Sequence, residues 1–234
     1  MTTGQELYNF VTSLNGGASI DETLLTVLVD NAKAILEGER PWMVLRKTDT
    51  SKSVTTGNTW QTPIDISTIT DFSQFYGELP IRIFDGNNTI EYYRQVPFDR
   101  RLEYKDVGNT FCYDAANKTV YLNGIVAFSG TLYINYIGTT SEIDLTAQTA
   151  VWSVFPHRFL PVLGYYAIGI HKGAVDYDDI NRAMLGPNGD ALQALKNAME
   201  KWDNELQLAS LEGNDPTNLY PYPRVNAIDR YADS

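Results

Sequence analysis

The stretch Asp190–Leu211 constrains this chain more than any other, because its apolar residues follow the helical period without a break. They alternate at spacings of three and four residues, which places them on one stripe of a helix. The stripe consists of Leu192, Leu195, Met199, Trp202, Leu206 and Ala209, with Gln193, Lys196, Lys201, Asp203 and Glu205 elsewhere on the surface. Asp190 suits the start of this helix, and Gly213 suits its end. We therefore predict an amphipathic helix whose Leu195, Met199 and Trp202 belong to the core.

A second long helix is predicted over Pro156–Met184, because proline fits a first helical turn. One face is lined by Phe159, Leu160, Leu163, Tyr166, Ala167 and Ile170. Val162 and Ile168 lie on other faces, so more than one side of this helix is expected to be covered. A helix covered on several sides is typical of the centre of a bundle or of an assembly.

Two shorter helices are predicted at the N-terminus, over Thr3–Leu14 and Ile20–Glu37. Ser19 and Glu22 have the spacing of a capping box at the start of the second. This helix carries Leu24, Val27, Leu28, Asn31 and Ile35 on one side. Gly38 and Pro41 then end it.

Between Trp42 and Thr140 the periodicity shortens to two residues, which indicates β-structure. Two hairpins are predicted, one joining 81–84 to 89–96 and one joining 111–113 to 119–122. Thr131–Ile137 is predicted as a longer strand and Trp42–Arg46 as another, while Asp71–Tyr76 is expected to form a helical turn. An antiparallel unit of about four to six strands, a common size for a sheet, would accommodate these segments.

The pattern as a whole predicts an α+β protein: an antiparallel helix bundle with an inserted antiparallel β unit and an extended C-terminal tail. Residues 1–40 and 150–211 would form the helical domain, 41–149 the β-rich insertion, and 212–234 an extended strap. Pro216, Pro221 and Pro223 exclude a helix in the strap, and its aromatic residues suit docking on a partner or on its own subunit. The alternative is a frayed terminus. Tyr220, Tyr222 and Arg224 are the predicted partner-binding residues.

The charge balance disfavours binding of nucleic acid. The 234 residues include 29 acidic and 18 basic side chains, a net charge of −11, whereas phosphate binding needs clustered Lys and Arg. The N-terminal sequence lacks the basic and apolar regions of a signal peptide, and no apolar stretch reaches the ~20 residues of a membrane span. We therefore expect a protein that is made and folded in a cytoplasm.

No strong catalytic or metal-binding pattern is present, so we expect neither a cofactor nor an enzymatic activity. His157 and His171 are too far apart in sequence to share a zinc ion in the pattern of two histidines on adjacent helical turns. The single cysteine, Cys112, is expected to be a buried apolar residue. The closest approach to a catalytic pair is Asp99 with Glu103, which leaves a carbohydrate-active enzyme as a remote alternative.

The order of parts resembles a known family. Two amphipathic helices precede a β-rich segment that ends in Gly-Thr-Leu-Tyr-Ile-Asn-Tyr-Ile (130–137). The helix Pro-His-Arg-Phe-Leu-Pro-Val-Leu-Gly-Tyr-Tyr-Ala (156–167), the acidic turn Asp-Tyr-Asp-Asp (176–179) and a long amphipathic helix follow. Over roughly residues 3–211 this layout resembles the head-to-tail adaptor proteins of tailed bacteriophages, also called connector or head-completion proteins.

The resemblance implies a structural protein of the virion neck, assembled in the host cytoplasm. In that family the helices pack side by side in a ring, usually twelve-fold, between the portal and a downstream tail or nozzle protein. DNA passes through the central channel without specific binding, and a C-terminal extension, here the strap, often reaches the portal. The family offers no catalytic residues. The alternative within the virion is a tail terminator or tail-tube partner, which is usually dominated by β-structure.

Overall fold

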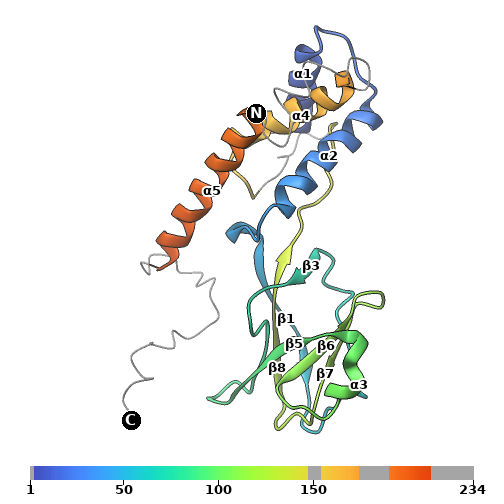
Figure 1. Ribbon diagram of the computed structural model, residues 1–234, viewed down its shortest axis with the longest axis vertical. Coiled ribbons are helices and arrows are strands. Elements are labelled where there is room, and N and C mark those ends of the chain that lie inside the picture. Colours follow the sequence, from blue (N-terminus) through green and yellow to red (C-terminus); the bar gives the residue numbers. More distant parts are fainter. Residues whose placement is uncertain (1–2, 147–153, 174–189, 212–234) are drawn as a thin grey trace.

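The computed structural model of this chain describes residues 3–146, 154–173 and 190–211 (Figure 1). A helical part lies at one end of the molecule and a β-barrel part at the other. The helices are α1 (Gly4–Leu14), α2 (Glu22–Gly38), α3 (Arg101–Tyr104), α4 (Leu160–Gly173) and α5 (Asp190–Leu211). The strands are β1 (Arg46–Val54), β2 (Ile64–Asp65), β3 (Phe72–Phe75), β4 (Ile81–Phe84), β5 (Ile90–Val96), β6 (Thr110–Asp114), β7 (Thr119–Leu122) and β8 (Gly130–Gly138).

The eight strands form one mixed sheet that curls into a nearly closed barrel. Its order is β1-β8-β4-β5-β6-β7-β2, and β3 pairs with the end of β8 beside β4. Every neighbouring pair is antiparallel except β5 and β6. A parallel pair needs a crossover rather than a hairpin, and here the crossover contains the 3₁₀ turn Phe98–Arg100 and α3.

The predicted fold class, an antiparallel helix bundle with an inserted antiparallel β unit, is therefore wrong: the sheet dominates the structure and is mixed. The error has a physical cause in β1, whose sequence is polar and whose only buried residue is Val54. A strand with no alternating apolar residues gives no periodic pattern to recognise. Two local predictions also fail, because 72–75 is strand β3 rather than a helical turn and Met43–Leu45 is a 3₁₀ turn rather than a strand.

The two predicted hairpins are confirmed as β4–β5 and β6–β7. In the first, Asp85 Oδ1 accepts hydrogen bonds from the backbone N–H groups of Asn87 and Thr89, and Gly86 takes a left-handed φ of 89°. A side-chain acceptor followed by glycine closes the turn without strain. In the second, Asp114 plays the same part toward Ala116.

Each part of the molecule has its own hydrophobic core. In the barrel the largest buried side chains come from strands on all sides and include Ile81, Ile83, Phe111, Leu122 and Leu132. In the helical part α1, α2 and α4 pack together around Leu7, Val11, Leu25, Val29 and Leu163. Gly4 lets α1 approach the backbone of Asp144, since a Cβ there would lie 1.9 Å from the Asp144 carbonyl oxygen.

Helix α5 is confirmed, and Met199 is fully buried as predicted. Trp202 is half-buried against the rings of Phe155 and Phe159. Asp203, which the sequence pattern places on the surface, is fully buried. Its carboxylate accepts a hydrogen bond of 2.6 Å from the Met43 backbone N–H and lies 3.2 Å from the Arg40 guanidinium, so this acid fixes α5 to the segment that enters the barrel. The side chains of Leu192, Leu195 and Ala209 lie outside the described residues.

The cap of the second helix differs from the prediction. The capping box is found at α1, between Thr3 and Glu6. At α2 the cap is Asp21, whose carboxylate accepts from the Leu24 N–H at 2.9 Å, rather than Ser19. Within the described part of the chain, no helix combines the length and apolar character needed to cross a membrane.

Candidate functional site

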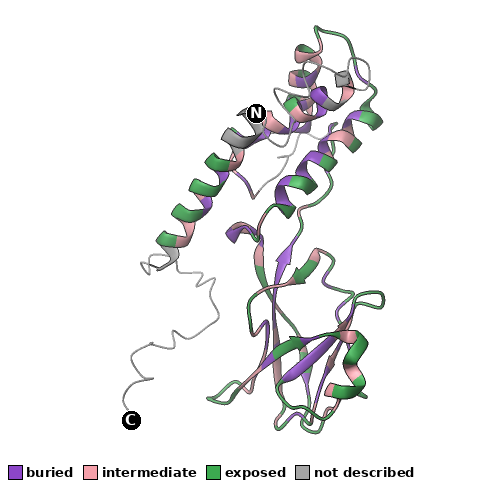
Figure 2. Ribbon diagram, in the orientation of Figure 1, coloured by how far each residue is buried: buried purple, intermediate pink, exposed green. Residues whose placement is uncertain are grey.

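Helix α2 has two apolar faces, and only one of them is covered. The inner face, with Leu25, Val29, Ala32 and Leu36, is buried in the helical core. Buried and exposed residues alternate along α2 (Figure 2), and the side named in the sequence pattern is largely exposed. We call it the α2 outer face, and it consists of Leu24 (43% exposed), Val27 (53%), Leu28 (half-buried), Asn31 (exposed) and Ile35 (44%).

The spacing of the α2 outer face is that of a helix that packs against another helix. Its residues recur at intervals of three and four, which keeps them on one stripe about as wide as the inner face. Asn31 is the only polar residue within the stripe. In helical seams, a single asparagine at a central position favours one register, since its amide must find a polar partner.

The margins of the α2 outer face are acidic. Asp21 and Glu22 lie at its start. Asp30 beside its middle is 3.6 Å from Lys33, and Glu39 beyond its end is paired with Lys196 at 2.7 Å. The only basic residue of α2 is Lys33, which is 5% exposed and turned away toward the barrel. Any partner of this face therefore meets negative charge chiefly at the start of the helix, at Asp21 and Glu22.

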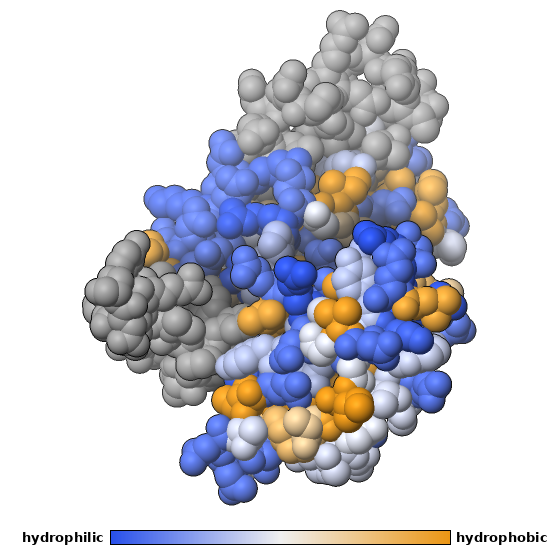
Figure 3. All heavy atoms as spheres, turned by 60° about the horizontal axis from the view of Figure 1, so that its bottom comes forward, coloured by the Kyte–Doolittle hydropathy of each residue, from blue (hydrophilic) through white to orange (hydrophobic). Residues whose placement is uncertain are grey.

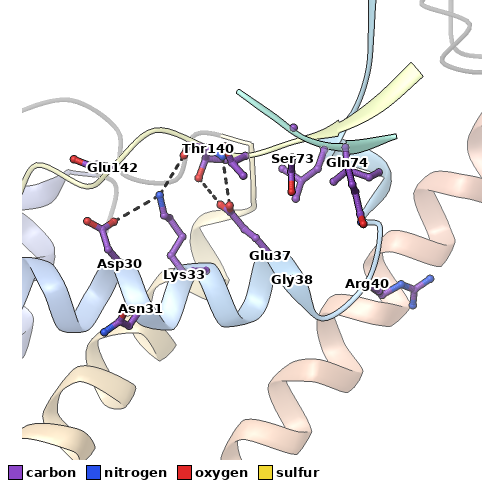
Figure 4. Close-up of a pocket in the computed structure, with 15 residues that line it drawn as sticks. Asp30, Asn31, Lys33, Glu37, Gly38, Arg40, Ser73, Gln74, Thr140 and Glu142 are labelled. Carbon is purple, nitrogen blue, oxygen red and sulfur yellow. Dashed lines mark hydrogen bonds and ion pairs between the residues drawn. The ribbon is translucent and has the colours of Figure 1, made fainter. Parts of the chain in front are cut away.

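A cleft of about 390 Å³ separates α2 from the barrel end that carries β3 and β8 (Figure 4). Lys33 and Glu37 point across it toward Thr140. The Lys33 ammonium donates to the carbonyl oxygens of Thr140 (3.3 Å) and Ser141 (2.6 Å) and lies 3.6 Å from Asp30. Glu37 accepts from the Thr140 backbone N–H and hydroxyl. Because buried charges are stable only when paired in this way, these contacts join the helical part to the barrel.

A second uncovered surface lies on α4 and beside it. We call it the α4 outer face, and it consists of Arg158, Val162 and Tyr165, spaced along one side of α4 and the turn before it, with Phe10 of α1. Arg158 and Tyr165 are exposed, whereas Val162 and Phe10 are half-buried and also pack against the helical core. Tyr165 is 38% exposed, and its ring meets that of Phe10 edge to face with centroids 5.4 Å apart. Next to it, a groove of about 350 Å³ runs between Arg158 and Phe159 on one side and Lys201, Trp202 and Glu205 of α5 on the other. This surface thus combines aromatic rings with two exposed cations, Arg158 and Lys201, and one exposed acid, Glu205.

The barrel offers no comparable stripe among its described residues. Its exposed hydrophobic side chains come from separate elements: Ile90, Leu102, Val107 and Ile125. In the view onto the barrel end, hydrophobic side chains lie scattered among hydrophilic ones (Figure 3). Isolated exposed apolar residues of this kind are ordinary on protein surfaces.

The predicted partner-binding residues Tyr220, Tyr222 and Arg224 lie outside the described residues. In the alternative catalytic pair Asp99 and Glu103, Glu103 is exposed and bound to Arg100, with Oε2 2.9 Å from Arg100 Nε. This hydrogen bond lowers the pKa of the Glu103 carboxyl, whereas a general acid of a glycosidase needs a raised pKa. Cys112 is buried as predicted, and burial raises the pKa of its thiol. Within the described ranges, no group of three or more acidic, histidine or cysteine side chains is arranged to hold a metal ion.

The outward direction of the α2 stripe is the feature that sequence analysis missed. Apolar residues occupy both of the sides described above, so their spacing alone gives two stripes and no means of choosing which one is buried. Charged residues usually mark the exposed side of a helix, but Lys33 and Glu37 lie on the covered side of α2 and so do not distinguish the two sides.

Neither a scan against protein-family models nor a search of curated proteins finds a match to this sequence.

Proposed function

We propose that this chain is a structural protein of the bacteriophage neck, whose copies form a ring between portal and tail and continue the channel for DNA. The observation that carries the proposal is the α2 outer face. Leu24, Val27 and Ile35 are each more than two-fifths exposed on a regular helical stripe, and stripes of this kind mark protein–protein contacts. The resemblance of the chain to head-to-tail adaptors supplies the identity of the assembly.

The charge of the chain suits this role. A net charge of −11 gives DNA little to bind, because affinity for the phosphate backbone depends on clustered cations. A ring of such chains would carry DNA without retaining it. The portal, the downstream tail or nozzle protein, and location in the virion neck belong to the same proposal, and the strap 212–234 remains the proposed contact with portal.

Light scattering after size-exclusion chromatography tests the proposal, with the chain alone and mixed with the portal protein of its phage. We expect a closed oligomer at least in the presence of portal. Val27→Glu should abolish this oligomer while leaving the far-UV circular dichroism and melting temperature of the chain unchanged. The matched control is Ile125→Glu on the barrel, where the side chain is 73% exposed.

Two outcomes would contradict the proposal. One is a strict monomer both alone and with portal. The other is equal loss of assembly in Val27→Glu and Ile125→Glu, since the effect would then come from added charge and not from the α2 outer face.

The eight-stranded barrel favours a second candidate, a tail terminator or tail-tube partner, because such proteins are dominated by β-structure. The helices α1, α2 and α5, of 11, 17 and 22 residues, favour the neck adaptor instead. Electron microscopy of the purified chain with portal and, separately, with tail tubes distinguishes the two. Rings seated only on tube ends would replace the neck adaptor with this candidate.

A further inference from the structure

We propose that the α2 outer face of one copy packs against the α4 outer face of a second copy. This inference rests on the proposed function and names the two surfaces that meet in the ring. It makes the contact heterologous, so that each copy uses two different surfaces and the contact can repeat around a closed ring.

Pairing of α2 with α2 of another copy is disfavoured by charge. In a parallel pair of identical helices, the acidic starts of the two copies, at Asp21 and Glu22, would meet. In an antiparallel pair each start would lie near Glu39, whose carboxylate is already paired with Lys196 at 2.7 Å. The only base of α2, Lys33, is buried and bound within its own subunit. Like charges brought together at an interface oppose association and select against the wrong partner.

The α4 outer face has the complementary character. Val162, Tyr165 and Phe10 supply apolar and aromatic surface for Leu24, Val27 and Ile35, and Arg158 with Lys201 places positive charge beside it. Aromatic residues and arginine are the side chains most enriched at the centres of protein interfaces. The guanidinium and the Tyr165 hydroxyl also give the Asn31 amide polar groups to pair with.

The arrangement of the helices permits this contact to repeat. In Figure 1, α2 and α5 lie on different sides of the helical part, with α4 between them. The inner faces of α2 and α4 are both buried in the same core, so their outer faces point away from each other's packing surface. One copy can therefore present its α2 outer face to a neighbour while a different neighbour contacts its α4 outer face.

Disulfide cross-linking between separately tagged chains tests the inference. One chain carries Val27→Cys and the other carries Val162→Cys. A disulfide forms only when the two Cα atoms come within about 7 Å, which requires these two faces to be in contact. Under mild oxidation we expect a band at twice the mass of the chain that contains both tags, and no such band for either variant alone. The native Cys112 is fully buried and serves as the background in the unaltered chain.

The control pair is Ile125→Cys with Val162→Cys, which places a thiol on the barrel at a position more exposed than Val27 (73% against 53%). Three results overturn the inference. Dimers of Val27→Cys with itself would mean that α2 pairs with α2, and a cross-link of Val27→Cys to Tyr222→Cys would mean that segment 212–234 covers α2. The third is a chain that light scattering shows to be oligomeric but that forms no more cross-link than the control pair. In the last case the ring survives and only the named surfaces are wrong. A strict monomer with portal instead defeats the proposed function itself.

Discussion

The buried carboxylate of Asp203 gives the sharpest test of how α5 is held. In Asp203→Ala the Met43 N–H, which now donates to Asp203 Oδ1 at 2.6 Å, loses its acceptor in a buried environment. An unsatisfied buried donor costs about 1–3 kcal/mol. The Arg40 guanidinium loses an ion pair of 3.2 Å but is 27% exposed, so solvent compensates much of that loss and leaves about 0–1 kcal/mol.

Gln207 Nε2, which donates to Asp203 Oδ2 at 2.8 Å, loses this acceptor as well. The first two losses together predict that Asp203→Ala lowers the free energy of unfolding by about 1–4 kcal/mol. For a chain of this size that corresponds to a fall in melting temperature of roughly 2–16 °C. Asp203→Asn keeps an oxygen for the Met43 N–H and loses only the charge, so its cost should be about 1 kcal/mol or less. Glu200→Ala, an exposed acid on the same helix, should stay within about 0.5 kcal/mol of the native chain.

Urea denaturation followed by far-UV circular dichroism measures these differences. The expected order of destabilisation is Ala at 203, then Asn at 203, then Ala at 200. If Asp203→Ala is no less stable than Glu200→Ala, the carboxylate is not buried against Met43 and the surface position predicted from the helical period is correct after all.

Two further substitutions test the packing of the rest of the molecule. Burial acts to raise the pKa of Asp71, but hydrogen bonds from Lys47 and a tyrosine hydroxyl outweigh it and lower that pKa. A carboxyl whose pKa is lowered by folding stabilises the folded state at pH values above its unfolded pKa near 3.8, and this stabilisation is lost as the pH falls through the folded pKa. Asp71→Asn should therefore be less stable than the native chain at pH 7, and the difference between their urea midpoints should close below about pH 4. A difference that does not depend on pH would refute the ionic contribution. Gly4→Ala should lower the free energy of unfolding by about 1–3 kcal/mol, because the new Cβ would overlap the Asp144 backbone. The control Gly38→Ala adds a Cβ that meets nothing within 4 Å, so it should leave the melting temperature unchanged or raise it slightly. Equal melting temperatures for the two variants would contradict the close approach of α1 to Asp144.

Local chemistry made part of this fold predictable. The hairpin β4–β5 follows from Asp85-Gly86-Asn87-Asn88, where an acceptor side chain and a glycine determine the turn regardless of what surrounds it. The helix α5 follows from its uninterrupted period. Both depend on residues within a few positions of one another, so the sequence alone contains the information.

The sheet was underestimated because its missing strands depend on distant partners. β1 is polar, with only Val54 buried, and is a strand because it pairs with β8 from Arg46↔Ile137 to Val54↔Gly130. β2 has two residues and depends on β7 in the same way. Such segments have no intrinsic pattern, since strand propensity mainly reports the packing of cross-strand neighbours.

Helix α2 shows why the α2 outer face could not be predicted from the sequence either. Its covered side includes Lys33 and Glu37, which are buried only because carbonyl and hydroxyl groups more than 100 residues later in the chain accept and donate to them. A count of apolar residues therefore cannot tell which stripe is the core, because apolar residues lie on both the covered and the exposed side and the covered side also carries two charges. Once the linker after β8 has satisfied Lys33, the rotation of the helix about its axis is fixed, and Leu24, Val27 and Ile35 are left in solvent. Because each of these side chains is about half exposed, it forgoes roughly half of the ~1.5–3 kcal/mol gained by full burial, and packing against a second copy would recover much of it.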